Sequence, residues 1–437
     1  MIKINNQLRN EYDCVVIGAG PAGGTAAAII ADAGHQVLLV EREKMPRFHV
    51  GESLMPEVYW TLKRLGVLDK VKAKGTFTTK NGVQFVTEKG KETKPFFFQD
   101  HDQRESSLTW HVQRADFDQI LFDNAAEKGA DCRDQTRVTG LHFRETGPHG
   151  VDLKLADGST RQVSARVIVD ATGQQSMIAN KLSLKQVDPN LKKAAIWGYF
   201  KNARRNQEKD GPEVTCILHT TGKKAWYWYI PLSDGNVSVG LVSNNELILK
   251  DRGKPCETFF EEMENCQGVK DRLADAELVG DVRVAKEFSY RTSKHAGDGW
   301  VLAGDAYSFI DPVYSSGVLL ALKSGEYVAD AVNEGLAKGD VSEAQLGKWT
   351  GEYEEGVGLF RKLVHAFYTD EFSFAEFMKQ YPQYKRDLTD LLIGRVYGEE
   401  EPGKIFEDMD PWIEHSKAGT LDAYRETLPD PPMMESM

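Results

Sequence analysis

The sequence predicts an α/β fold, in which a mixed, mainly parallel sheet is joined to an inserted antiparallel sheet and to a helical C-terminal region. Three observations predict it. A strand, a glycine-rich turn, a helix and a second strand follow one another within residues 13–41, which is the order of a parallel βαβ unit. Residues 195–246 are rich in β-branched and aromatic side chains, as strands are. Residues 341–437 are acidic and aromatic, with a mostly helical pattern.

The first element of the chain is the best defined. Asp13–Ile17 is a short apolar stretch that predicts a buried strand. Thr25–Ala33 is rich in alanine and predicts a helix, which Gly34 closes. Val37–Val40 predicts a second buried strand, and the acidic residue Glu41 ends it.

Between the first strand and the helix lie Gly18, Gly20 and Gly23, with the spacing Gly-x-Gly-x-x-Gly. Gly18 allows a tight turn, Gly20 lets a pyrophosphate approach the backbone, and Gly23 lets the helix pack closely on the strand. The phosphates of such a ligand rest on the helix N-terminus. Glu41 is placed to accept hydrogen bonds from ribose hydroxyls, which an ordinary glycine turn would not require. The stretch therefore predicts a Rossmann-like domain that binds an adenine dinucleotide.

Size and composition narrow the class of protein. The 437 residues can hold two or three intertwined domains with a large core. The net charge of −12 disfavours nucleic acid and anionic membrane surfaces as main partners. No apolar run approaches the ~20 residues that span a bilayer, and the polar first residues predict no secretory signal. The scattered cysteines, without a Cys-x-x-Cys or a histidine cluster, predict no metal site and a cytoplasmic protein with reduced thiols.

The remaining elements follow from hydrophobic pattern and turn residues. The pattern predicts strands within residues 76–98, 131–169 and 279–291, and helices over residues 57–65, from about 111 to 129, and from about 315 to 332. Asp157-Gly158 and Asp234-Gly235 are predicted hairpin turns. The last residues are rich in proline and are predicted to form a disordered tail.

Three separated stretches agree with one family. They are Gly18–Glu41, Asp170–Gly173 and Gly304–Asp305, and with them the chain resembles the flavoprotein hydroxylase superfamily. The resemblance implies that FAD binds between these stretches, with Arg114 at the flavin or its phosphates and Asp305 at the ribityl–pyrophosphate part. The cofactor contacts that it implies are Gly18, Gly20, Ala22, Gly23, Glu41, Arg42, Ser53, Arg114, Asp305 and Gly317.

The resemblance also implies a division of the chain into domains. An FAD-binding domain would comprise residues 1–75, 110–185 and 280–340. A substrate domain built on the antiparallel sheet would comprise residues 76–109 and 186–279. Residues 341–437 would form the helical C-terminal region with its disordered tail.

A tryptophan-rich strand narrows the family. Residues 226–231, Trp-Tyr-Trp-Tyr-Ile-Pro, look like the Trp-x-Trp-x-Ile-Pro signature of flavin-dependent halogenases. In a strand, Trp226, Trp228 and Ile230 project from one face and the two tyrosines from the other. The resemblance implies that this segment, with Pro231, forms a wall that keeps the organic substrate away from the flavin. The simpler interpretation is a set of core aromatic residues, which strands favour in any case.

A second motif indicates a halide site. Residues 309–317, which run from Phe309 through Pro312 to Gly317, look like the halogenase pattern Phe-x-x-Pro-x-x-Ser-x-Gly. A helix N-terminus with unpaired N–H groups suits an anion, and the resemblance assigns chloride or bromide to the backbone of Ser316 and Gly317. A plain serine-capped helix is compatible with the same residues. Tyr314 stands where tryptophan halogenases carry a glutamate, which favours the phenol and pyrrole halogenases.

The catalytic residue of the family is a lysine, and the matching position is Lys80, within Phe77-Thr-Thr-Lys-Asn-Gly82. It lies between Phe77 and Phe85 and follows the Gly-Glu-Ser loop at residues 51–53 at the distance the family shows. Most lysines are solvated surface charges, and this region contains several. Lys74 is the next candidate.

These motifs imply an FADH2-dependent halogenase that installs chlorine or bromine on a phenol or pyrrole, free or bound to a carrier protein, in natural product biosynthesis. In such enzymes a separate flavin reductase supplies the reduced FAD. O2 then gives a flavin C4a-hydroperoxide, halide gives hypohalous acid, and the lysine directs the halogen. Two other functions fit the scaffold. One is an aromatic monooxygenase or a geranylgeranyl-reductase-like oxidoreductase, reduced directly by NAD(P)H. The other is a non-catalytic flavoprotein-like carrier, which would tolerate loss of Lys80.

Overall fold

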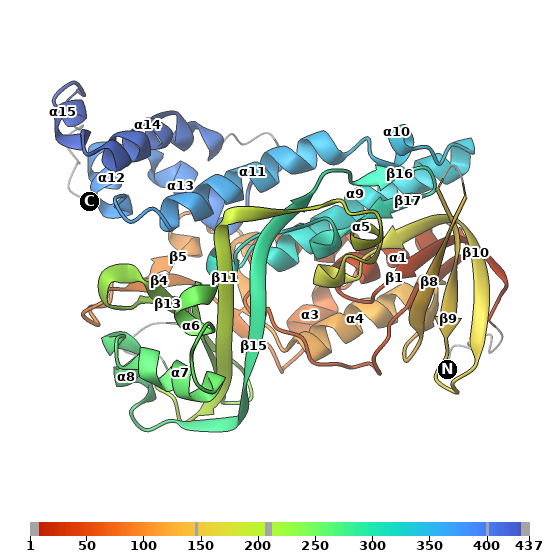
Figure 1. Ribbon diagram of the computed structural model, residues 1–437, viewed down its shortest axis with the longest axis horizontal. Coiled ribbons are helices and arrows are strands. Elements are labelled where there is room, and N and C mark those ends of the chain that lie inside the picture. The colour runs from red at the N-terminus through yellow and green to blue at the C-terminus, as the bar shows by residue number, and fades with distance from the viewer. Residues whose placement is uncertain (1–7, 145–146, 206–211, 399–401, 430–437) are drawn as a thin grey trace.

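The computed structural model describes residues 8–144, 147–205, 212–398 and 402–429. Figure 1 shows two large sheets side by side, with a layer of C-terminal helices running across the top of both. This arrangement confirms the predicted α/β class. The predicted disordered tail falls mainly on residues 430–437, which lie outside the described residues. Within the described ranges, no helix has the length and apolar character needed to cross a membrane.

The first sheet contains the predicted βαβ unit. Five strands run parallel in the order β7, β2, β1, β10, β17, and β8, β9 and β16 extend the sheet with antiparallel pairs. Its apolar central strands are covered on both faces, so they show no alternation of polar residues. The predicted meander over residues 131–169 is confirmed for β8 to β10, whereas β7 pairs in parallel with β2. The strands are β1 (Glu11–Ile17), β2 (Val37–Val40), β7 (Asp131–Arg133), β8 (Arg137–Arg144), β9 (Gly147–Lys154), β10 (Thr160–Asp170), β16 (Ala296–Gly297) and β17 (Trp300–Leu302).

Helix α1 (Pro21–Asp32) follows the glycine turn and begins earlier than predicted, because proline fits the first position of a helix. Gly18 has a φ of +102°, and a Cβ there would lie 2.4 Å from the carbonyl oxygen of Ala171. A Cβ on Gly23 would lie 1.9 Å from the carbonyl oxygen of Gly18. These two glycines therefore let the helix, the turn and strand β10 approach one another.

The second sheet is antiparallel except where β12 pairs in parallel with β4. Its order is β18, β15, β11, β14, β13, β12, β4, β5, and the long strands β11 and β15, near the β18 edge of this sheet, stand upright in Figure 1. β15 and β18 belong to this sheet although they lie largely within residues 280–340, and the division of the chain into domains stays a prediction. The strands are β4 (Gly82–Val86), β5 (Phe96–Phe97), β11 (Lys185–Lys201), β12 (Thr215–His219), β13 (Ala225–Pro231), β14 (Val237–Asn244), β15 (Glu277–Thr292) and β18 (Ser308–Phe309).

Both predicted hairpin turns are confirmed. Asp157 lies in the turn between β9 and β10, and its carboxylate accepts from the N–H of Ser159 at 2.8 Å. Asp234 lies in the turn between β13 and β14, and its carboxylate accepts from the N–H of Asn236 at 3.0 Å. Aspartate and glycine suit such turns because they form local hydrogen bonds and accept positive φ.

Helices cover the sheets and form the C-terminal layer. The predicted helix after residue 315 is α9, which continues to Lys338 rather than ending near Val332 and stops at Gly339 in the left-handed conformation. Residues 341–429 confirm the predicted helical character. The other helices are α2 (Val58–Arg64), α3 (Leu68–Ala73), α4 (Arg114–Glu127), α5 (Met177–Lys181), α6 (Asn245–Ile248), α7 (Pro255–Met263), α8 (Gln267–Leu273), α10 (Glu343–Leu346), α11 (Thr350–Phe367), α12 (Phe374–Gln380), α13 (Lys385–Ile393), α14 (Ile405–Ala418) and α15 (Leu421–Arg425).

Candidate active site

A pocket with a cavity volume of about 290 Å³ runs from the carboxyl ends of the parallel strands to the tryptophan strand β13. This is where ligands bind in open α/β sheets. Of the predicted cofactor contacts, Gly23 does not reach the pocket, because it packs on the backbone of Gly18. Those that line the pocket are Gly18, Gly20, Ala22, Glu41, Arg42, Ser53, Arg114, Asp305 and Gly317.

The pocket fits an adenine dinucleotide at the glycine turn. A Cβ on Gly20 would have no atom nearer than the guanidinium of Arg47, at 3.8 Å, so the backbone there faces open space. Gly20 is also the N-cap of α1, whose first N–H groups suit phosphates. Glu41 lines the same end, where one carboxylate oxygen accepts from the N–H of Ala19 at 3.2 Å. The donors and the acceptor that FAD requires are therefore present.

A buried ion cluster, which the sequence did not predict, holds the loop over the pocket. Asp118 on α4 binds Arg114 at 2.9 Å and Arg47 at 2.8 Å, and Arg47 also lies 3.3 Å from Glu41. Burial would raise the pKa of Asp118, but the charges of Arg114 and Arg47 outweigh it and lower that pKa. The four-residue spacing of Arg114 and Asp118 on a predicted helix could have indicated this ion pair from the sequence.

Asp305 lines the pocket from the turn after β17, which packs near Ala22 at the start of α1. Burial raises its pKa to about 6, while the charges of Arg114 and Lys185 act in the other direction. Its backbone carbonyl accepts a hydrogen bond from the hydroxyl of Tyr290. A carboxylate in this setting can accept hydrogen bonds from the hydroxyl groups of a ribityl chain, whereas it would repel a phosphate.

Strand β13 shows the predicted period of two. Trp226, Trp228 and Ile230 face the pocket, whereas the tyrosines between them pack in a separate apolar core. The indole N–H of Trp226 donates to the hydroxyl of Tyr368 at 2.7 Å, which anchors it to the C-terminal helices. Pro231 does not line the pocket, and its carbonyl instead accepts from the ring of His111.

Lys80 lies in a small antiparallel ribbon formed by β3 (Thr78–Lys80) and β6 (Thr109–His111). Its side chain is 2% exposed, and Nζ donates to the carbonyl oxygen of Leu54 at 2.7 Å. The ring of Phe98 lies 5.7 Å from Nζ, and within the described residues no carboxylate pairs with it. Burial lowers the pKa of Lys80 to about 7.

The other candidate, Lys74, has an ordinary surface setting. Its side chain is 38% exposed and its Nζ lies 3.6 Å from the carboxylate of Asp116. Such an exposed pair contributes little to stability. Of the two candidates, Lys80 therefore has the buried environment that activates an amine.

The predicted halide segment forms a short turn before α9. Ser315 takes the left-handed conformation, with φ 61° and ψ 24°, and Ser316 is the N-cap residue of α9 (Gly317–Lys338). Ser316 occupies the N-cap position that the serine-cap interpretation requires, but among the described residues its side chain makes no capping hydrogen bond. Tyr314 is buried against Phe367 of α11.

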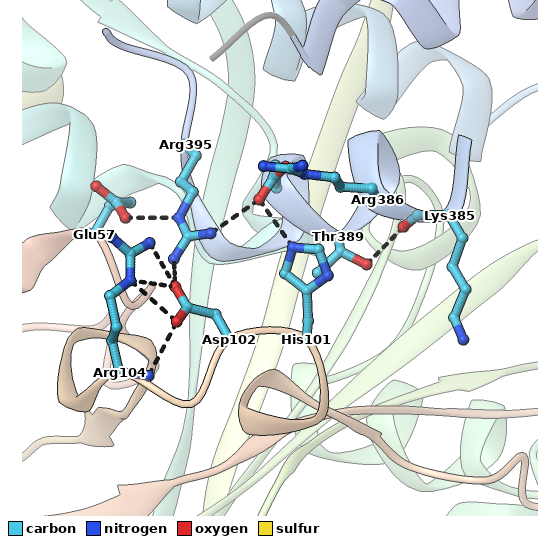
Figure 2. Close-up of polar contacts among 9 residues, drawn as sticks. Glu57, His101, Asp102, Arg104, Lys385, Arg386, Thr389 and Arg395 are labelled. Carbon is cyan, nitrogen blue, oxygen red and sulfur yellow. Dashed lines mark hydrogen bonds and ion pairs between the residues drawn. The ribbon is translucent and has the colours of Figure 1, made fainter. Parts of the chain in front are cut away.

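A second cavity lies between residues 94–104 and α13 (Figure 2). At its base Arg395 binds three carboxylates: Glu57 at 3.2 Å, Asp390 at 3.1 Å, and Asp102. Asp102 also binds Arg104, and Figure 2 shows these charges as one continuous cluster. The cluster joins the segments on either side of the cavity.

Comparisons with known proteins agree with this geometry. A family model described as FAD binding domain matches residues 11–344, which confirms FAD as the dinucleotide. The chain is 31% identical over 420 residues to a 1H-pyrrole-2-carbonyl-(peptidyl-carrier protein) chlorinase of Pseudomonas fluorescens, covering 92% of each. It is 33% identical over 378 residues to the flavin-dependent halogenase rdc2 of Metacordyceps chlamydosporia, covering 80% of this chain and 70% of rdc2.

Solved structures lead to the same family. The flavin-dependent brominase Bmp2 superposes with a TM-score of 0.82 at 28% identity, covering 92% of this chain and 99% of Bmp2. The chain therefore belongs to the FAD binding domain family and, within it, to the flavin-dependent halogenases.

Proposed function

We propose that the protein halogenates a pyrrole ring carried on a carrier protein, and that Lys80 delivers the halogen. The observation that carries the proposal is the setting of Lys80, a buried amine whose pKa burial lowers to about 7. A group with that pKa is partly neutral at neutral pH. A neutral amine can take up an electrophilic halogen, and in either state it can donate a hydrogen bond to hypohalous acid.

FAD would be held by the glycine turn, by the N-terminus of α1, and by Arg47, Arg114 and Asp305 around the pocket. When bound in its reduced form, it would donate electrons to O2 and bring it to the peroxide level, and oxygen at that level can oxidise the halide to hypohalous acid. The chain contains no second dinucleotide fingerprint beyond Gly18–Gly23. We therefore expect a separate flavin reductase to deliver the reduced cofactor.

Chloride or bromide would bind at the backbone N–H groups of Ser316 and Gly317, where α9 begins. In the part of the chain that the structure describes, no acceptor bonds these two groups. Trp226, Trp228 and Ile230 would separate the organic ring from the flavin, so that only a small oxidant reaches Lys80. This separation favours halogenation over direct hydroxylation.

The share of each relative's length that this chain matches supports a carrier-bound pyrrole as the substrate. The pyrrolyl carrier-protein chlorinase is matched over 92% of its length, whereas the fungal halogenase rdc2 is matched over 70%. A carrier-bound pyrrole is therefore the preferred substrate class. A free phenol is the competing class, because Tyr314 replaces the glutamate of tryptophan halogenases without separating phenols from pyrroles.

The test is a turnover assay with FAD, a flavin reductase, NADH, and chloride or bromide. Pyrrole-2-carbonyl on a carrier protein, free pyrrole-2-carboxylate and simple phenols are compared, and the isotope pattern in mass spectrometry identifies the product. We expect halogen on the carrier-bound pyrrole. Product from phenols alone would contradict the substrate class. Rapid, substrate-stimulated NADPH oxidation without the reductase would indicate a monooxygenase instead.

A further inference from the structure

Four polar side chains from separate segments form a hydrogen-bonded chain beside the pocket. The hydroxyl of Ser315 donates to Oγ of Ser53 at 3.0 Å, and Oγ of Ser53 lies 2.8 Å from Oγ1 of Thr215. Oγ1 of Thr215 lies 2.8 Å from Nε2 of His111, whose Nδ1 lies 3.0 Å from the carbonyl oxygen of Pro231. The three hydroxyl residues line the pocket, and His111 is 1% exposed.

The chain has one direction. A carbonyl oxygen only accepts, so Nδ1 of His111 carries the ring proton. Burial, and after it the charge of Lys80, lowers the pKa of His111 well below its usual value, so the ring is neutral and Nε2 accepts. The hydroxyl of Thr215 therefore donates to Nε2 and accepts from Ser53, which in turn accepts from Ser315.

This direction determines whether Ser315 presents a hydrogen-bond donor or an acceptor to the pocket. The proton of the Ser315 hydroxyl points inward, and among the described residues no donor bonds its oxygen. The oxygen is therefore an acceptor toward the pocket, whereas the backbone of Ser316 and Gly317 offers donors. Ser315 keeps its left-handed conformation without being glycine, a strain that is typical of functional positions.

The inner end of the chain lies beside Lys80. In the ribbon of β3 and β6, Thr78 pairs with His111 and Lys80 pairs with Thr109, so Lys80 and His111 project from the same face. Leu54, whose carbonyl holds Nζ of Lys80, directly follows Ser53. The hydrogen-bonded chain therefore connects the pocket with the surroundings of the lysine.

We propose that His111 and Thr215 are positioning residues for halogenation, because they fix the direction of this chain and so keep Ser315 an acceptor in the pocket. An acceptor favours a neutral oxidant that carries an O–H group, such as hypohalous acid, and does not compete with the backbone for the halide anion. The proposal rests on the proposed function, in which the halide lies at α9 and the halogen is transferred at Lys80.

Three substitutions of threonine test the proposal through turnover. Thr215→Val keeps the shape and removes the hydroxyl, Thr215→Ser keeps the hydroxyl, and Thr258→Val is the control. Thr258 is fully buried on α7, and its hydroxyl has no hydrogen-bond partner among the described residues. We expect Thr215→Val to lower kcat about tenfold without raising the KM for halide, Thr215→Ser to stay within about threefold of wild type, and the control to equal wild type. Equal losses in Thr215→Val and Thr215→Ser, or wild-type turnover in Thr215→Val, would overturn the proposal.

Ser315→Gly distinguishes the effect of the hydroxyl from that of the backbone conformation. Glycine removes the hydroxyl and adopts the left-handed conformation without strain. We expect this variant to melt no lower than wild type and to lose turnover as Thr215→Val does. Wild-type turnover in Ser315→Gly would contradict a role for the hydroxyl.

Nitrogen-15 NMR of the protein without FAD gives a readout that does not depend on activity. We expect a neutral His111 ring protonated on Nδ1, with an Nε2 signal that shifts in Thr215→Val and not in Thr258→Val. A ring protonated on Nε2 would overturn the direction of the chain. If wild type halogenates none of the substrates, the proposed function fails, and this measurement still decides the direction of the chain.

Discussion

Lys80 and Arg395 are both buried basic residues, and both lie near one small apolar cluster of Val83, Phe98 and Ile393. Phe98 contacts Lys80, and Ile393, which belongs to the same cluster, precedes Arg395 by two residues. Their partners differ completely. Arg395 is surrounded by three carboxylates, as Figure 2 shows, whereas the one hydrogen-bond acceptor found for Lys80 among the described residues is the carbonyl of Leu54.

The difference is the one expected between a structural charge and the catalytic amine that we propose. Burial opposes the charge of Arg395, but Asp102 and Glu57 raise its pKa, so the guanidinium stays protonated and holds three segments together. Nothing offsets burial at Lys80, so its amine loses the proton near neutral pH. A buried lysine without a carboxylate partner is costly for stability, and this cost supports the proposed catalytic role of Lys80.

The largest expected effect is on product. Lys80→Ala should lower halogenated product at least about 100-fold, while FAD binding and NADH consumption with the reductase persist. Lys80→Arg should also fail as a haloamine former, because a guanidinium stays protonated. Arg395→Met, assayed at a temperature where it is folded, should keep turnover within about threefold of wild type. Mass spectrometry of the product and a hypohalite-scavenging dye measure these outcomes. Residual activity in Lys80→Arg would favour a hydrogen-bonding role for the lysine.

The second effect is on stability, and it has opposite signs at the two residues. Arg395→Met leaves buried carboxylates without their cation and should lower the free energy of unfolding by about 3–5 kcal/mol. Lys80→Met should raise it at pH 6, because an unpaired buried amine is replaced by an apolar chain of similar length. Urea denaturation of the two variants and wild type measures both changes. A second substitution, Asp390→Asn, should restore part of the loss in Arg395→Met, and no restoration would argue against the cluster as its cause.

The third effect is the pH dependence of the Lys80 contribution. The lysine pKa is about 10.4 in an unfolded chain and about 7 in the folded protein. Between these values the unfolded state binds more protons, so wild type gains stability relative to Lys80→Met as pH rises from about 7 to about 10, by up to about 1.4 kcal/mol per unit. Below pH 7 the difference should be constant. Denaturation at pH 6, 7, 8 and 9 checks the slope, and a flat difference would mean that Lys80 does not titrate there.

The smallest effect is the control at the surface. Lys74→Ala removes an exposed lysine with a loose ion pair and should change the free energy of unfolding by no more than about 0.5 kcal/mol. Its turnover should stay within about twofold of wild type. If this variant loses product and Lys80→Ala keeps it, the catalytic lysine has been assigned to the wrong position in this loop.

Local features of the chain could be predicted from sequence because they depend on neighbouring residues. The turn at Gly18 follows from glycine spacing, and the opposite faces of Trp226 and Tyr227 follow from the two-residue period of a strand. Local sequence does not distinguish a buried lysine from a solvated one. Lys80 could therefore be chosen only through the family motif. The prediction ended α9 too early, near Val332. The helix continues to Lys338 and ends where Gly339 takes the left-handed conformation.

The tertiary structure alone decided the chemistry of these side chains. The pKa of Lys80 depends on its burial, and the ring of Phe98, which lies 5.7 Å from Nζ, is not placed near it by the local sequence. Arg47 meets Asp118 across 71 residues, and Ser315 meets Ser53 across 262. Burial and hydrogen bonding act through space, so their effects on protonation and on the direction of hydrogen bonds appear only when distant segments fold together.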